Sequence, residues 1–247
     1  MDRPLRCAKS VRMTLAERSL ARRHPGVELV RFSAAELDRH QAAGFRSQHG
    51  QDVFLSRVLG DADHPGTFVD IGCNRPHGGN NSSWLESRGW SGYAFDPQAT
   101  FAEAWAAERT TPFIRAAISG HVGERDFVQF RSVAGWEHEL SGFADYASPA
   151  HLQAYPHDRH SVPTGPIAHF VPDLGPVDLV LVDVEGAEME VLDGIGLEEL
   201  RPRWLLIENN RTLGGHDAIR GRIVGCGYRF VARIGRTDDF YERTASD

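Results

Sequence analysis

The sequence predicts an α/β fold with a doubly wound parallel β-sheet. Five short β-rich segments alternate with helix-like segments, which is the pattern of successive βαβ units. Residues 177–184 read VDLVLVDV, a run continuous enough to be buried on both faces as parallel strands are. The length of 247 residues suits one large α/β domain, or a core domain with a short appendage. The expected strands are Thr67–Ile71, Tyr93–Asp96, Phe113–Ile118, Val177–Val184 and Trp204–Ile207.

The chain begins with a basic segment that is expected to be helical. Ser10–His24 places Val11, Leu15 and Leu20 near one face of a helix and arginines elsewhere. Such a helix either packs on the core with a solvated face, which is the commoner case, or binds a partner or a membrane surface. Pro25-Gly26 then breaks the chain, and Ala34–Gln41 forms another short helix. We therefore expect an N-terminal helical extension, residues 1–46, before a domain of residues 47–247.

Helices and a terminal hairpin complete the pattern after residue 47. The expected helices are Ser82–Arg88, Ala99–Arg109, Ala187–Ile195 and His216–Val224, and Tyr228–Ile234 with Asp239–Arg243 forms the hairpin. Residues 131–165 fit no regular element and are rich in aromatic residues and histidine. A loop of this length is usually functional or mobile, so we interpret it as an active-site lid; the alternative is a surface insertion without a substrate role. Its candidate substrate-facing residues are Trp136, His138, Phe143, Tyr146, Tyr155, His157 and His160.

Charge and cysteine content exclude several classes of protein. Residues 1–46 carry ten basic and five acidic side chains, whereas residues 47–247 carry 17 basic and 29 acidic ones. An acidic body argues against nucleic acid as the main partner, because binding to a phosphate backbone requires excess positive charge. Three scattered cysteines are too few for a disulfide framework or a zinc site. No stretch approaches the ~20 apolar residues of a membrane span, so we expect a soluble, cytoplasmic protein.

Polar residues at the ends of the first two strands indicate a nucleoside pocket. In a doubly wound sheet, ligands bind at the carboxyl edge of the strands. The first strand ends in Asp70-Ile71-Gly72-Cys73-Asn74, a glycine turn that lacks the GxGxxG of dinucleotide binding. The second ends at Asp96, which either accepts hydrogen bonds from both ribose hydroxyls or caps the helix that starts near Pro97. A nucleoside without a pyrophosphate suggests S-adenosylmethionine, whose positive sulfonium suits an acidic pocket.

Carboxylates at the ends of two later strands suggest a divalent metal. The fourth strand runs into Asp183, Glu185 and Glu188, which would repel one another unless a cation or a proton relieves them. The fifth ends in Glu208-Asn209, so Asp183, Glu208 and Asn209 form a candidate magnesium site of hard oxygen ligands. From spacing alone, carboxylates that cap helices and face solvent are an equally good interpretation.

Six segments of the chain match the motifs of one known family. They are SQHGQD at 47–52, FVDIG at 68–72, GNNSSWLESRGWSGYAFDPQ at 79–98, RAAIS at 115–119, VDLVLVDVEGAEMEVLDGI at 177–195 and the ending GYRFVARIGRTDDFYER. On these segments the chain resembles the FkbM family of S-adenosylmethionine-dependent methyltransferases. The resemblance implies the class I methyltransferase fold, a seven-stranded sheet with an antiparallel last strand. It also implies O-methylation of a hydroxyl on a sugar or a secondary metabolite, as in natural product biosynthesis.

The resemblance assigns cofactor contacts by position. Asp70, Gly72 and Asn74 would line the methionine part of S-adenosylmethionine, Asp96 would hold the ribose, and the Ala116-Ala117 turn would lie beside the adenine. The matching segments add Gln48, Asn81, Ser82, Pro97 and Asp183. The chain departs from the family at residues 72–77, which read GCNRPH where many members have Gly-Ala-x-Asp-Gly.

Catalysis requires that the acceptor be aligned with the methyl group and lose its hydroxyl proton. Coordination to a divalent ion, expected to be Mg²⁺ held by Asp183, Glu208 and Asn209, would lower the pKa of that hydroxyl. Asp183 is thus a catalytic residue, Glu185 or Glu188 is the expected base, and His138 competes for that role. Alternatives are a metal-independent methyltransferase that uses a carboxylate or histidine base, and a non-catalytic S-adenosylmethionine-binding partner protein. The acceptor is expected to be a small molecule, and the N-terminal segment is a candidate contact of a homo-oligomer.

Overall fold

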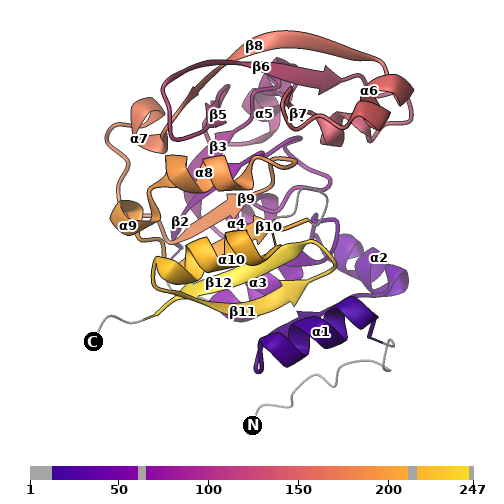
Figure 1. Cartoon of the computed structure of the whole chain (residues 1–247), viewed down its shortest axis with the longest axis vertical. Coiled ribbons are helices and arrows are strands. Elements are labelled where there is room, and N and C mark those ends of the chain that lie inside the picture. The colour runs from indigo at the N-terminus through magenta and orange to yellow at the C-terminus, as the bar shows by residue number, and fades with distance from the viewer. Residues whose placement is uncertain (1–12, 61–64, 211–215, 245–247) are drawn as a thin grey trace.

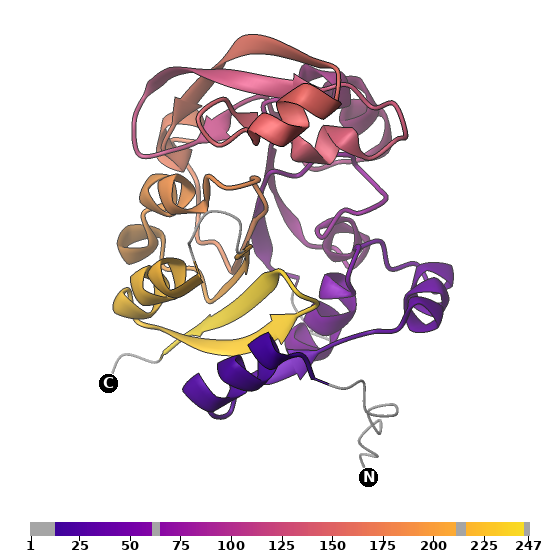
Figure 2. The same cartoon turned by 45° about the vertical axis from the view of Figure 1, so that its right-hand side comes forward.

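The computed structural model describes residues 13–60, 65–210 and 216–244. The strands in these residues form two β-sheets, which we call the large sheet and the small sheet. The large sheet has eight strands in the order β1-β11-β12-β10-β9-β2-β3-β4, and the small sheet has four in the order β5-β8-β6-β7. The small sheet forms the upper part of the molecule, and the large sheet with its helices lies below it (Figure 1, Figure 2).

The centre of the large sheet is parallel, as the sequence predicts. β2 (Thr67–Ile71) pairs in parallel with β3 (Ser91–Phe95) and with β9 (Leu179–Val182), and β9 pairs in parallel with β10 (Trp204–Glu208). The terminal hairpin β11 (Tyr228–Ile234) and β12 (Asp238–Arg243) joins this group, with β12 antiparallel to β10. The predicted α/β fold is therefore confirmed, with a mixed sheet.

Alternating side chains of the central strands pack on two layers of helices. On one face, Val180 and Leu205 belong to the cluster that contains residues of α7 (Ile167–Phe170), α8 (Glu188–Ile195), α9 (Leu197–Leu200) and α10 (His216–Gly225). On the other face, Leu181 and Leu206 belong to the cluster with α3 (Gln51–Leu59) and α4 (Ser83–Ser87). Period-2 alternation of apolar residues therefore gives three layers, since each strand is buried on both sides. No helix within the described ranges has the length and apolarity that crossing a membrane requires.

The N-terminal segment contributes a strand as well as helices. α1 (Leu15–Arg23) and α2 (Ala34–Ala42) each begin with a capping box, at Thr14 and at Ser33. Between them, β1 (Glu28–Val30) pairs in parallel with β11. The large sheet therefore has eight strands where the resemblance implies seven. The predicted helical residues 10–12 lie outside the described part of the chain.

The expected strand Phe113–Ile118 is two strands in two different sheets. β4 (Phe113–Ile114) pairs with β3 at the edge of the large sheet, whereas β5 (Ala117–Ile118) pairs with β8 of the small sheet. Ala116 donates its backbone N–H to the carbonyl of Ile114 at 2.9 Å, which turns the chain between them. Similarly, the expected helix Ala99–Arg109 comprises a short 3₁₀ turn, η1 (Ala99–Phe101), and α5 (Ala102–Glu108).

Residues 131–165 are largely regular, contrary to the prediction. They contain η2 (Glu137–Leu140), β7 (Gly142–Phe143), α6 (Pro149–Ala154) and β8 (His157–Gly165). β8 pairs along its length with β6 (Gly123–Phe130), and both strands carry many exposed polar side chains. The backbone ladder thus forms a strand from a sequence with little apolar alternation, so the pattern of apolar residues does not predict it.

Candidate functional site

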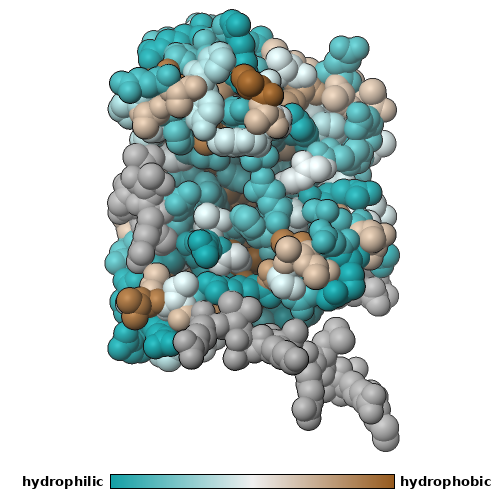
Figure 3. Space-filling model, turned by 90° about the vertical axis from the view of Figure 1, so that its right-hand side faces the viewer, coloured by the Kyte–Doolittle hydropathy of each residue, from teal (hydrophilic) through white to brown (hydrophobic). Residues whose placement is uncertain are grey.

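A pocket lies where β2, β3, β9 and β10 end, beneath β6, η2 and β7. On the face in Figure 3, the surface is hollowed between the upper and lower parts of the molecule. Of the predicted site residues, Ser82, Glu188 and Asn209 are absent from the pocket lining. The others line it: Gln48, Asp70, Gly72, Asn74, Asn81, Asp96, Pro97, Ala117, His138, Asp183, Glu185 and Glu208.

The glycine turn after β2 is determined by its contact with β9. Gly72 has φ +81°, and a Cβ there would lie 1.7 Å from the carbonyl oxygen of Asp183. Close packing of two backbones therefore requires glycine at this position. The turn is also tied to β3, because Gly72 and Cys73 both donate their backbone N–H to the carbonyl of Phe95.

Asp70 is buried in the pocket floor with an unused acceptor. The residue is 5% exposed, and its Oδ2 has no hydrogen-bond partner among the residues that the structure describes. Burial raises the pKa of Asp70 to about 6, although hydrogen bonds from Ser82 and Asn80 and the charge of Arg109 lower it. Ser82 therefore contacts Asp70 from outside the pocket lining. A buried oxygen without a partner is suited to a ligand that donates a hydrogen bond or carries positive charge.

Asp96 is held in place by the two backbone segments beside it. Its Oδ2 accepts the N–H of Asn74 at 3.0 Å, and its Oδ1 accepts the N–H of Gln98 at 2.8 Å. Burial raises the pKa of Asp96 to about 7 in spite of these bonds, and the charge of Asp70 adds to the rise. Gln98, rather than Asp96, is the residue that precedes the helical turn η1. The carboxylate therefore fixes the pocket rim, and its environment favours a cationic or hydrogen-donating ligand.

Asn80, which the sequence motifs did not single out, holds the loop from Gly72 to α4. It donates to the carbonyls of Cys73 and Arg75 and accepts from the N–H groups of Ser82 and Ser83. The adjacent Asn81 lines the pocket. The GNNSS run in the sequence was a signal for this turn, but it did not show which asparagine bends the chain.

Three carboxylates converge at the ends of β9 and β10. Oxygens of Asp183, Glu185 and Glu208 all lie within 4.8 Å of one another. Burial and the negative charge of Glu208 raise the pKa of Asp183 well above its usual range, and burial with the charge of Asp183 does the same for Glu185. Burial raises the pKa of Glu208 to about 8. Such a group of hard oxygens can bind a divalent cation, which would offset the repulsion.

Asp238, which the sequence motifs also did not single out, extends this acidic group. It lines the pocket, is buried, and pairs in register with Glu208 across β10 and β12. Burial raises its pKa, and Gln51 donates to its Oδ2 at 3.2 Å. An antiparallel strand begins at the edge where parallel strands end, so β12 delivers its first residues to the site. The antiparallel direction of the last strand was therefore the signal from which Asp238 could have been predicted as a site residue.

Asn209 and Glu188 lie behind the three carboxylates. Asn209 is completely buried and donates its Nδ2 to Asp239 at 2.7 Å. Glu188 lies in the first turn of α8, where its carboxylate accepts the N–H of Gly186 at 2.9 Å, and burial raises its pKa. Neither arrangement brings the side chain into the pocket lining, so the predicted roles of Asn209 as a ligand and Glu188 as a base stay predictions.

The upper wall of the pocket comes from the small sheet and η2. Phe127, His138, Ser141 and Phe143 line it. The other aromatic and histidine residues predicted to face the substrate lie outside the lining: Trp136, Tyr146, Tyr155, His157 and His160. Burial and the charge of Arg75 lower the pKa of His138 to about 4, so its imidazole is neutral at physiological pH.

Glu137 orders the loop that carries His138. Its carboxylate accepts backbone N–H groups from Val133, Ala134, Gly135 and Trp136 at 2.8 to 3.3 Å. His138 itself approaches the hydroxyl of Ser132 at 2.9 Å through Nδ1. A buried carboxylate with four backbone donors is a strong local constraint, so the loop at 133–136 that leads into η2 and His138 has a defined shape.

Similarity to known proteins covers most of the chain. The family model described as "Methyltransferase FkbM domain" matches residues 70–230. No curated protein matches the chain. A solved structure described as "Crystal structure of monomeric WbdD" is 15% identical in sequence with a TM-score of 0.42, and the match covers 91% of this chain and 48% of that chain. The chain therefore spans about half the length of that protein.

Proposed function

The chain belongs to the FkbM methyltransferase family, and on that basis we propose that it is an S-adenosylmethionine-dependent O-methyltransferase. The acceptor in this proposal is a hydroxyl group of a small molecule, such as a sugar or a secondary metabolite. The observation that carries the proposal is the acidic pocket at the carboxyl edge of the large sheet, which joins Asp70 and Asp96 to Asp183, Glu185 and Glu208.

The residues at the ends of β2 and β3 suit S-adenosylmethionine. The Oδ2 of Asp70, which no described residue contacts by a hydrogen bond, would accept one from the cofactor or face a positive group. Asp96 would accept the ribose hydroxyls, and Ala117 with Pro97 would border the adenine. When bound, S-adenosylmethionine supplies a methyl group on a positively charged sulfur that leaves as a neutral thioether. Seven buried or partly buried carboxylates line this one pocket and favour a ligand of that charge: Asp70, Asp96, Glu139, Asp183, Glu185, Glu208 and Asp238.

The carboxylates at the ends of β9 and β10 suit a divalent ion. Asp183, Glu185 and Glu208 are the proposed ligands, since their oxygens lie close together, and Mg²⁺ prefers such oxygens. A bound ion would supply a Lewis acid that lowers the pKa of the acceptor hydroxyl. If Glu185 is a metal ligand, another group must accept the hydroxyl proton of the acceptor, and we favour His138 as that base. It lines the pocket, and its lowered pKa keeps the imidazole neutral, although the same low pKa makes it a weak base.

The acceptor would lie between the acidic group and the small sheet. Phe127 and Phe143 provide apolar surface on that side, and Ser141 provides a hydroxyl. Packing of an acceptor between these walls would exclude water from the transferring methyl group. The lid proposal thus applies to η2, β7 and the loop before them, with α6 and β8 as their support.

Calorimetric titration with S-adenosylmethionine tests the proposal directly. Wild type is expected to bind it, and Asp96→Asn is expected to bind at least tenfold more weakly, because the variant loses the negative charge beside the ribose. Asp38→Asn, at an exposed residue of α2, is the matched control and should bind as wild type does. Absence of binding by folded wild-type protein would reject the proposed cofactor. Once an acceptor is identified, turnover can be measured after exhaustive chelation of divalent metals. Unchanged turnover would reject the metal-assisted mechanism and favour the metal-independent alternative.

A further inference from the structure

A second cavity, the arginine groove, lies between α1, the end of β10 and the turn that joins β11 to β12. Among the described residues that line it, five are arginines and two are acidic, Glu17 and Asp217. The arginines are Arg23, Arg31, Arg220, Arg233 and Arg236. The chain as a whole has a net charge of −7, so this concentration of positive charge contrasts with its composition.

We propose that the arginine groove binds an oxyanion of the methyl acceptor, so that the substrate is an anionic, hydroxyl-bearing molecule such as a phosphorylated one. This inference rests on the proposed function, because it concerns the substrate of the same reaction. Guanidinium groups bind phosphate and carboxylate oxygens with paired N–H donors, which gives both affinity and orientation.

Four of the five arginines have acidic partners. Arg220 and Arg233 both bind the buried Asp239, at 2.9 Å and 2.7 Å. Arg31 forms an ion pair with Glu17, and Arg23 pairs with Asp217 at 2.9 Å. The contacts of Arg220 and Arg233 with Asp239 are buried and hold one wall of the groove in place, whereas the exposed pair of Arg23 with Asp217 adds little.

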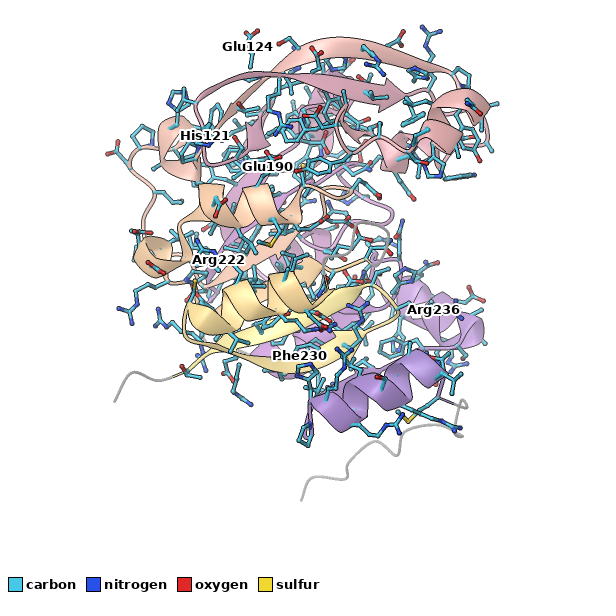
Figure 4. All side chains as sticks on the ribbon, in the orientation of Figure 1. His121, Glu124, Glu190, Arg222, Phe230 and Arg236 are labelled. Carbon is cyan, nitrogen blue, oxygen red and sulfur yellow. The ribbon has the colours of Figure 1, made fainter. Side chains whose placement is uncertain are left out.

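Arg236 is the arginine that the wall leaves available. Its side chain is exposed at the turn between β11 and β12, where Figure 4 labels it, and no described residue makes a hydrogen bond or ion pair with its guanidinium. Burial and the positive charge of Arg236 lower the pKa of Arg31, so the two guanidinium groups repel each other. An oxyanion between them would relieve that repulsion and receive donors from both sides.

The arginine groove adjoins the acidic pocket, so that one substrate would reach both. Thr237 lines both cavities. Asn210 lines the groove and donates to Glu208 of the acidic group at 3.4 Å. A substrate with its hydroxyl at Asp183 and Glu208 would therefore place an attached oxyanion toward Arg236. Opposite charges at the two ends would also fix the direction in which the substrate binds.

The test uses anion binding rather than activity. Pyrophosphate, inorganic phosphate and acetate are titrated calorimetrically, without divalent metal, into wild type, Arg236→Ala and Arg31→Ala. Wild type is expected to bind pyrophosphate, with affinity at least tenfold lower in both variants. Arg159→Ala, at an exposed arginine of β8, removes the same charge elsewhere and should bind as wild type does. If pyrophosphate and phosphate bind but acetate does not, the substrate is assigned as phosphorylated. If acetate binds equally well, the substrate class also includes carboxylates.

Two results would overturn the inference: no binding of pyrophosphate by wild type at millimolar concentration, or equal binding by wild type and Arg236→Ala. S-adenosylmethionine is titrated into the same samples, and its affinity should be unchanged in Arg236→Ala. Failure of wild type to bind S-adenosylmethionine would reject the proposed function. The pyrophosphate titration still reports on the groove in that case, so the two failures are distinguishable.

Discussion

The carbonyl oxygen of Asp183 occupies the space that a side chain on Gly72 would need. An ideal Cβ at Gly72 would lie 1.7 Å from that oxygen, far inside van der Waals contact. The contact joins the turn after β2, which borders the pocket, to the start of the acidic group after β9. A change at Gly72 therefore acts on both parts of the site through the backbone.

We expect Gly72→Ala to destabilise the protein far more than Gly78→Ala. Both glycines have positive φ, +81° and +67°, so alanine at either costs about 1–2 kcal/mol of backbone strain. A Cβ at Gly78 meets no described atom within 4 Å, whereas one at Gly72 collides with the backbone of Asp183, directly after β9. Chemical denaturation of the two variants measures the difference in the free energy of unfolding. Equal losses would mean that the contact with Asp183 is relieved at little cost.

The buried acids of the pocket should make the free protein less stable as pH rises. The pKa of Asp70 is raised to about 6 and that of Asp96 to about 7, against about 3.9 for aspartate in an unfolded chain. The folded state therefore binds more protons than the unfolded state between about pH 4 and pH 7. Stability from these groups is present below about pH 4 and is lost through that window.

Asp96→Asn tests this pH dependence. Asparagine has no proton to lose, so the free energy of unfolding of the variant should decrease less than that of wild type between about pH 5 and about pH 8. Comparison of the two proteins at each pH cancels the titration of His138 and of other groups. Denaturant titrations without cofactor or metal provide the measurement, with Asp38→Asn as control. Parallel pH profiles for wild type and Asp96→Asn would contradict the raised pKa of Asp96.

The sequence predicted the central strands and the acids that follow them, because both depend on local patterns. β2 has the expected bounds, and the ends of β9 and β10 lie within a few residues of those expected. These strands are buried on both faces, so their sequences are continuous apolar runs that are easily recognised. Asp70, Asp96, Asp183 and Glu208 then reach one edge of the sheet as a consequence of parallel topology.

Features that depend on pairing between distant segments could not be predicted in this way. β8 reads HDRHSVPTG, and only its ladder with β6 makes it a strand. Asp238 reaches the site because β12 runs antiparallel to β10 and begins beside Glu208. The side chain of Asn209 lies close in sequence to Glu208 but turns to Asp239, since that buried carboxylate needs donors.

Glu137 should control the order of the loop that carries His138. Glu137→Ala leaves four backbone N–H groups without their acceptor, so we expect faster amide hydrogen exchange at residues 133–136 and lower catalytic efficiency once an acceptor is known. Glu124→Ala, on β6, removes an exposed carboxylate of the same sheet and should change neither quantity. Unchanged exchange in Glu137→Ala would contradict the role of this carboxylate in shaping the pocket wall.

The identity of the third metal ligand separates two interpretations of the acidic group. If Asp183, Glu185 and Glu208 bind the ion, Glu185→Gln should weaken Mn²⁺ binding at least tenfold, because it removes one of three charged ligands. Asn209→Ala should then retain Mn²⁺ binding but lose about 1–3 kcal/mol of stability, because Asp239 loses a buried donor.

Glu199→Gln, at an exposed residue of α9, is the control for charge. Calorimetry with Mn²⁺ and denaturation of the same samples give both quantities. Weakened binding in Asn209→Ala, with normal binding in Glu185→Gln, would instead identify the amide as the ligand and leave Glu185 free to act as the base.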